Sequence, residues 1–328
     1  MNENTISPRD AQWREELRKT HTAKERTSIP RVKMTELAPD YRVTCNEEVN
    51  QGLSRDQAVL EATRCLDCPD PQCITGCPVG INIPGFIKNI ERGNLKDAAI
   101  VLKETSALPA VCGRVCPQER QCESKCIYNK MKKPPVAIGY LERFAADSER
   151  LSGDSSLPPR MAANGKKVAV VGSGPAGLSF AGDMARRGYE VHVYEALHEI
   201  GGVLKYGIPE FRLPNEVVDV EIKSLEKSGV KFMTDCVVGK TLSYDDLLDR
   251  GFNGIFVASG AGLPRFMGIE GENLVGVMSS NEYLTRVNLM GAGREGWATP
   301  VIRGKRVAVI GGGNTAMDSC RTARRMDA

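Results

Sequence analysis

The residues of this sequence best suited to chemistry are its cysteines. The chain has 11 of them, and eight lie between Cys65 and Cys126. The first group reads Cys65-x2-Cys68-x4-Cys73-x3-Cys77-Pro78, and the second contains Cys112, Cys116-Pro117, Cys122 and Cys126. Iron–sulfur clusters are bound by cysteine thiolates at short spacings, often with proline after a ligand, and eight thiolates suit two [4Fe-4S] clusters.

Two other interpretations of these cysteines stay open. A structural zinc site uses paired ligands around one tetrahedral ion, whereas these cysteines split unevenly and two of them precede proline. Scattered free thiols are the other alternative. Cys45, Cys236 and Cys320 stand apart from both groups, and each is interpreted as a small buried apolar side chain.

A second chemical feature is a glycine-rich turn between an expected strand and an expected helix, formed by Gly172, Gly174, Pro175, Ala176 and Gly177. In a G-x-G-x-x-G pattern the first glycine permits a tight turn, the second lets the backbone approach a pyrophosphate, and the third lets helix and strand pack closely. The helix N-terminus then faces the phosphates. Glu195, after the next strand, would accept hydrogen bonds from ribose hydroxyls and repel a 2′-phosphate, so the turn predicts FAD or NAD.

The segment that follows favours FAD over NAD. Its glycines would let the backbone approach a flat ring, with a purely structural turn as the alternative. The candidate residues in this segment are Gly202, Leu204, Gly207, Ile208 and Pro209.

The G-x-G-x-x-G pattern, a fingerprint of dinucleotide binding, occurs a second time near the end of the sequence, as Gly311, Gly313 and Ala316. Alanine at the third position still allows close packing. Two fingerprints predict two dinucleotides, one flavin and one nicotinamide. The residue that would choose between NADP(H) and NAD(H) is expected near position 334, past Ala328, so this choice stays open.

The elements that must position these residues change in type near residue 150. Residues 54–64 predict a helix with a Ser54/Gln57 capping box that delivers Cys65. Two helices broken at Gly93–Asn94 and another over 136–149 complete a mainly helical domain. After a linker, expected strands at 167–171, before Glu195, at 252–260 and at 306–310 predict a parallel α/β fold.

The fold class is therefore α+α/β. The expected parts are an N-terminal arm (1–35), a helical domain with two [4Fe-4S] clusters (36–150), a linker (151–165), a Rossmann-like FAD-binding domain (166–300) and the truncated start of a Rossmann-like NAD(P)H-binding domain (301–328).

The totals agree with this organisation. A chain of 328 residues suits two or three domains. A net charge of +3 gives no reason to expect nucleic acid or a membrane as partner. The N-terminus has no apolar signal segment, so we expect a cytoplasmic protein, where dense cysteines indicate metal or redox chemistry rather than disulfides. No catalytic acid–base residue stands out, and His21, His192 and His198 have no partner signature.

The sequence resembles the small-subunit family of NADPH-dependent glutamate synthase. Relatives of that family are the large subunit of NADH-dependent ferredoxin:NADP oxidoreductase and the N-terminal part of dihydropyrimidine dehydrogenase. The stretches that carry the resemblance are CLDCPDPQCITGCPVGINIPGFI, ALPAVCGRVCPQERQCESKC, VAIGYLERFAAD, VAVVGSGPAGL, GGVLKYGIPEFRLP and VAVIGGGNTAMD.

The resemblance implies how the cofactors are held. One [4Fe-4S] cluster would take Cys65, Cys68, Cys73 and Cys126, and the other would take Cys77, Cys116, Cys122 and either Glu142 or Cys112. The Gly202–Pro209 segment and Gly260 would border the flavin ring. Gly311, Gly313, Asn314 and Ala316 would meet NADP(H) or NAD(H). Electrons would pass from NAD(P)H through FAD and the clusters to a larger FMN-containing or ferredoxin-linked partner subunit.

Three alternatives stay open beside a glutamate synthase small subunit. The first is a subunit of a ferredoxin:NADP oxidoreductase or a sulfide dehydrogenase, which has the same build. The second is a non-catalytic iron–sulfur interaction fragment, because the family has a longer C-terminal half than this chain. The third is a zinc-binding scaffold.

Overall fold

The computed structural model describes residues 6–153, 157 and 159–328. These residues form two compact units. Unit 1 comes from the chain up to Glu36 and from Asn50–Arg160, and unit 2 comes from Leu37–Val49 and Met161–Ala328. Part of the expected arm (1–5) and part of the expected linker (154–156 and 158) lie outside the described residues.

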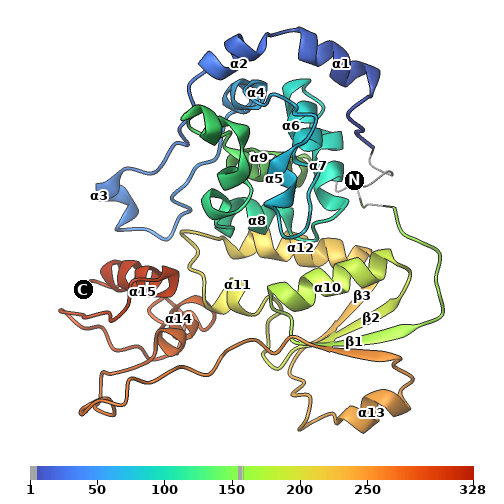
Figure 1. Ribbon diagram of the computed structural model, residues 1–328. Helices are drawn as coiled ribbons and strands as arrows, with labels where there is room; N and C mark the ends of the chain where they lie inside the picture. Colours follow the sequence, from blue (N-terminus) through green and yellow to red (C-terminus); the bar gives the residue numbers. More distant parts are fainter. Residues whose placement is uncertain (1–5, 154–156, 158) are drawn as a thin grey trace. The chain divides into compact units, whose positions relative to one another are not determined.

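Unit 1 is helical (Figure 1). Its α-helices are α1 (Gln12–Lys19), α2 (Ala23–Ser28), α4 (Arg55–Thr63), α5 (Gln72–Thr75), α6 (Ile83–Glu91), α7 (Leu95–Lys103), α8 (Pro109–Val115) and α9 (Ile138–Ser152). Three short 3₁₀ helices are η1 (Gln118–Arg120), η2 (Glu123–Lys125) and η3 (Ile127–Met131).

Side-chain caps start the helices of unit 1 that carry most of its core. Ser54 and Gln57 form the expected capping box of α4. Asn82 caps α6 and Asn94 caps α7, so the expected break at Gly93–Asn94 is present. Helix α9 runs on to Ser152 and takes the first two residues of the segment expected as linker.

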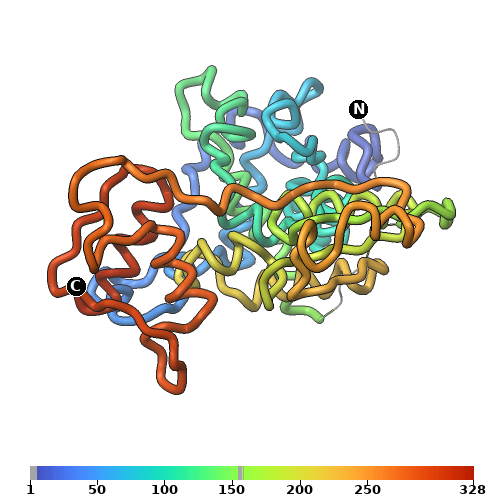
Figure 2. Tube along the Cα trace, turned by 90° about the horizontal axis from the view of Figure 1, so that it is seen from below, coloured from blue at the N-terminus to red at the C-terminus, as the bar shows by residue number. Residues whose placement is uncertain are grey.

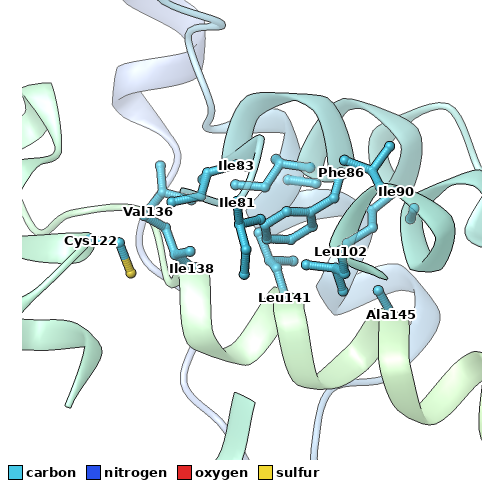
Figure 3. Packing of buried hydrophobic residues seen from close by; sticks show 14 of the residues in the cluster. Ile81, Ile83, Phe86, Ile90, Leu102, Cys122, Val136, Ile138, Leu141 and Ala145 are labelled. Atoms are coloured by element: carbon cyan, nitrogen blue, oxygen red, sulfur yellow. The ribbon is translucent and has the colours of Figure 1, made fainter. Parts of the chain in front are cut away.

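The core of unit 1 lies between α4, α6, α7 and α9. Figure 3 shows apolar side chains of these helices packed together, with Cys122 at one edge of the cluster beside Ile138. Cys65, Cys73, Cys77 and Cys126 are half-buried and pack against the same cluster. The apolar core therefore packs directly against the cysteines and fixes their positions.

Unit 2 combines a sheet with helices (Figure 1). Its elements are α3 (Pro39–Arg42), β1 (Lys167–Val171), α10 (Pro175–Arg186), β2 (Glu190–Tyr194), α11 (Val203–Tyr206), α12 (Asn215–Lys227), β3 (Val230–Met233), α13 (Tyr244–Asp249), β4 (Gly254–Val257), α14 (Ser280–Asn288) and α15 (Asn314–Arg325).

The sheet has the strand order β3-β2-β1-β4 with every pair parallel. Val170 of β1 lies opposite Val193 of β2 and Phe256 of β4. Helices α10 and α12 cover one face (Figure 1). The other face packs against residues 236–252, including Leu247 of α13. Parallel strands with helical crossovers confirm the predicted α/β fold.

The strand expected at residues 306–310 is not formed. These residues are described and lie between a bend and α15, with Ile310 74% exposed. A strand needs a neighbour for its backbone hydrogen bonds, and no described residues supply one beside 306–310. The apolar run alone predicted the strand wrongly.

Residues 37–49 belong to unit 2 although they interrupt the sequence of unit 1. The Val49 amide donates to the Phe211 carbonyl at 3.0 Å, and Arg325 Nε donates to the Cys45 carbonyl at 2.7 Å. Figure 2 shows this blue segment beside the red end of the chain.

Candidate functional site

Three cysteines of the first sequence group and one of the second line a cavity in unit 1 of about 280 Å³. Cys65, Cys68, Cys73 and Cys126 all face it. Cys65 follows α4 directly, and Cys73 lies on α5. Apolar side chains of α6 and Tyr128 form the rest of the wall. The structure thus brings together, around one space, the four cysteines that the resemblance places on one cluster.

Burial controls the acidity of these thiols. Burial raises the pKa of Cys65 to about 11, and the nearby Lys88 ammonium opposes that rise. Burial, followed by the neighbouring Cys65, Cys126 and Cys68, also raises the pKa of Cys73. Bound iron stabilises thiolates, so four cysteines around one cavity are a donor set that fits an iron–sulfur cluster.

The second cysteine group lies around Glu142. A hydrogen bond from the Cys112 thiol lowers the pKa of Cys116 to about 7, and the same bond raises that of Cys112. Burial, then Glu142, raises the pKa of Cys122 to about 12, with Cys77 also contributing. Cys112 and Glu142 therefore both lie near the other members, and both remain candidates for the eighth ligand.

The described residues contain no group of three or more His, Cys, Asp or Glu side chains arranged to hold a single metal ion. In the same part of the chain, none of the helices is both apolar and long enough to span a bilayer.

The first glycine turn of unit 2 has the geometry expected of a phosphate-binding loop. Gly172 has φ +103°, and a Cβ there would lie 2.4 Å from the Ala258 carbonyl oxygen. A Cβ at Gly177 would lie 2.0 Å from the Gly172 oxygen. Gly174 caps α10 and faces open space, with Pro175 at the first helical position. The loop therefore exposes backbone and a helix N-terminus where phosphates would bind.

Glu195 is tied to this loop by hydrogen bonds that the sequence did not reveal. Its Oε2 accepts from the backbone N of Ser173 at 2.8 Å and from the Ser173 hydroxyl at 2.5 Å. Its Oε1 accepts from the Leu197 amide at 2.9 Å. The Gly201 amide donates to the Ser173 hydroxyl at 3.0 Å. Ser173, fully buried, joins the loop, the end of β2 and the Gly201–Gly202 turn.

The segment expected to border the flavin ring begins against the loop. A Cβ at Gly202, which has φ +53°, would lie 2.7 Å from the Gly174 Cα. Leu204 and Pro209 are buried, and Gly207 and Ile208 are half-buried at the end of α11. Gly260 follows β4, has φ +73° and faces open space. The backbone is thus accessible at the loop and at Gly260.

The second fingerprint forms its helix but not its strand. Gly311 has φ +137°, Gly313 caps α15, and Asn314 is its first residue. The Ala316 Cβ lies 3.2 Å from a Cβ built at Gly311. Asp318, further along α15, forms a 2.6 Å ion pair with Arg212.

The chain matches two protein families in the expected order. Residues 42–153 match the family described as dihydropyrimidine dehydrogenase domain II, 4Fe-4S cluster. Residues 166–328 match the pyridine nucleotide-disulphide oxidoreductases. These matches confirm the prediction of an iron–sulfur domain followed by a nucleotide-dependent oxidoreductase domain.

Named relatives give the same result. The glutamate synthase [NADPH] small chain of Escherichia coli K12 is 38% identical over 285 residues, which are 86% of this chain and 60% of that protein. That of Azospirillum brasilense is 37% identical over 287 residues, 86% of this chain and 59% of that protein. The chain is a homologue of the glutamate synthase small chains.

A third relative carries a different name. Subunit PreT of the NAD-dependent dihydropyrimidine dehydrogenase of Escherichia coli O157:H7 is 37% identical over 270 residues, 81% of this chain and 62% of that protein. The homologue spans about 60% of the length of the small chains that it matches. The resemblance predicted from the sequence is confirmed.

Proposed function

We propose that this chain carries electrons from NAD(P)H, through FAD, to two [4Fe-4S] clusters, as the small subunit of a glutamate synthase. The observation that carries the proposal is that one chain contains two cysteine groups in unit 1 and, in unit 2, a glycine loop with a buried carboxylate. The order of the two matched families supports it.

In unit 1, Cys65, Cys68, Cys73 and Cys126 would hold one cluster around the 280 Å³ cavity. Cys77, Cys116 and Cys122 would hold the other, with Glu142 or Cys112 as the fourth ligand. The hydrogen bond from Cys112, which lowers the pKa of Cys116 to about 7, favours the thiolate form that iron binds.

In unit 2, which we assign as a Rossmann-like fold, Gly172, Gly174 and Gly177 would hold the FAD pyrophosphate at the start of α10. FAD accepts a hydride and releases single electrons when bound. Glu195 would bind ribose through the acceptor capacity that Ser173 and Leu197 leave on its carboxylate. The turn of Gly311 and Gly313 would meet NADP(H) or NAD(H).

The electron acceptor is proposed to be a larger, FMN-containing partner subunit in the cytoplasm. The similarity to PreT favours a second candidate, a subunit of the same build that serves another acceptor. Both candidates share the electron path through this chain, and they differ in the partner that reoxidises the clusters.

The test is anaerobic purification of the chain, followed by assay of iron, acid-labile sulfide, zinc and flavin per polypeptide. We expect about eight irons with matching sulfide, as two [4Fe-4S] clusters require, together with FAD that is bleached by NADPH or NADH. Zinc without sulfide would contradict the cluster assignment. If the clusters and the flavin are present but neither nucleotide bleaches the flavin, hydride transfer is contradicted. The chain is then a non-catalytic iron–sulfur interaction fragment.

A further inference from the structure

A lysine is fully buried beside Cys65, one of the four cysteines that line the cavity. Lys88 lies on α6, and its side chain is 0% exposed. Its Nζ donates to the Cys65 carbonyl oxygen at 2.5 Å. The residue before it, Ile87, lines the cavity that Cys65 also lines. The ammonium group is thus held next to the place where the first cluster would be bound.

The charge of Lys88 is only partly neutralised by its surroundings. Glu91 Oε2 lies 2.5 Å from Lys88 Nζ, but Glu91 Oε1 also pairs with Arg26 at 2.7 Å. Glu91 and Arg26 are buried too, with side chains 4% and 3% exposed. Two cations share one carboxylate, so the buried trio carries a net charge of +1 beside Cys65.

Other buried ionic groups lie near this cavity, and one of them, at Asp67, also joins two cations to one carboxylate. Arg64, stacked on Tyr128, pairs with Glu61 at 2.6 Å. Asp67 pairs with both Arg14 and Arg18. The trio of Lys88 differs from these because its surplus cation contacts the backbone of a cysteine.

Packing alone gives little reason for a lysine at this position. Removing an ammonium group from water is costly, and apolar side chains often replace buried ion pairs without loss of stability. A net positive charge close to an iron–sulfur cluster, in contrast, has a direct electrostatic effect, because reduction adds an electron to an anionic cluster.

We propose that Lys88 raises the reduction potential of the cluster held by Cys65, Cys68, Cys73 and Cys126. The inference rests on the proposed function for the presence of the cluster. The step is one-electron reduction from the 2+ to the 1+ core, with dithionite as the electron donor in the test and no proton transferred.

The experiment is a redox titration of the intact chain followed by EPR, with the two cluster signals tracked separately. We expect Lys88→Met to lower one midpoint potential by at least the equivalent of a tenfold change in equilibrium constant, about 59 mV for one electron. Glu91→Gln removes the shared carboxylate, so it should move the same potential upward. The other cluster should keep its potential in both variants.

Lys103→Met is the matched control. Lys103 is also a buried lysine of unit 1, with Nζ 2.5 Å from Glu149, but, unlike Lys88, it has no chain neighbour that lines the cavity. A structural role for Lys88 would change stability in all these variants and leave the potential of an intact cluster unchanged.

Iron and sulfide are assayed before each titration. A wild-type chain without clusters would overturn the proposed function and this inference together. Clusters whose potentials do not move in Lys88→Met and Glu91→Gln, or move in the same direction, would overturn the inference alone. If Lys88→Met does not retain its cluster, Glu91→Gln decides the inference. An upward shift of the cluster potential supports it, and no shift or a downward shift overturns it.

Discussion

Ser173 shows how one hydroxyl can organise a glycine-rich loop. It donates to Glu195 and accepts from Gly201, so three segments that are distant in sequence meet at one oxygen. Hydrogen bonds to a charged carboxylate are stronger than neutral ones. We therefore treat Ser173 as a positioning residue for the proposed FAD site.

Substitution of Ser173 by alanine should weaken FAD binding. The variant loses the hydroxyl that holds Glu195 and Gly201, and a net loss of about 1.4 kcal/mol corresponds to about tenfold in affinity. The measurement is fluorescence titration of the flavin-free chain with FAD.

Ser228→Ala is the control for that titration, because Ser228 directly follows α12 and its hydroxyl donates to the Ser224 carbonyl of that helix at 2.9 Å. Equal affinities of the Ser173 and Ser228 variants would show that the bridge does not position the FAD site.

The position of Glu195 was predictable because a carboxylate after the second strand of this motif has a known use. Its engagement with Ser173 was not, because the residue between the first two glycines carries no signal in the pattern. The grouping of cysteines around one cavity likewise depends on how α4, α5 and η3 fold together, which spacing alone leaves open.

At the scale of elements, helix α1 is fastened to the loop between Cys65 and Cys68. Arg14 and Arg18 both pair with Asp67, and Arg9 Nε donates to the Asp67 carbonyl at 3.1 Å. Asp67 is fully buried and has φ +50°, a conformation that aspartate and asparagine tolerate better than most residues.

Asp67→Asn should therefore lower the stability of unit 1. Asparagine keeps the size and the tolerance of positive φ but leaves Arg14 buried without its counter-ion. Breaking such a pair costs about 3 kcal/mol. Urea unfolding followed by circular dichroism measures the change.

The matched variant is Asp70→Asn on the same loop, because Asp70 is exposed. An unfolding midpoint of Asp67→Asn equal to that of Asp70→Asn would contradict a stabilising role for the arginine cluster.

Local signals predicted several elements well. Capping residues and a glycine break located α4, α6 and α7. Apolar segments typical of buried strands located β1 and β4, and the strand expected before Glu195 is β2. Helix α8 and strand β3 were not predicted, since both are short. The strand expected at 306–310 failed for the opposite reason, because its local pattern is strong but pairing is a tertiary property.

At the scale of the whole molecule, the segment of residues 37–49 joins parts of unit 2 that are far apart in sequence. Arg325 of α15 donates to Cys45, and its guanidinium carbon lies 3.8 Å from the centre of the Phe211 ring. Phe211 in turn accepts from Val49. One arginine thus holds the segment and the aromatic ring together.

Arg325→Met should loosen this segment. We expect faster hydrogen exchange at the amides of Leu37 and Val49, whose acceptors lie within the same unit. Hydrogen exchange with mass spectrometry measures it. Arg324→Met is the control, because Arg324 is exposed and bonds only to Ala328. Unchanged protection of residues 37–49 in Arg325→Met would refute the link.

The path of residues 37–49 has a consequence for how the protein can be divided. The chain passes between the two units after Glu36, again after Val49 and a third time after Arg160. A protease cut near residue 160 would separate residues 161–328 from the rest of the chain and leave residues 37–49 of unit 2 attached to unit 1. A piece that starts at residue 161 would lack thirteen residues of its own unit. The two units are therefore not interchangeable modules joined end to end, and any exchange of one between proteins must carry this insertion with it.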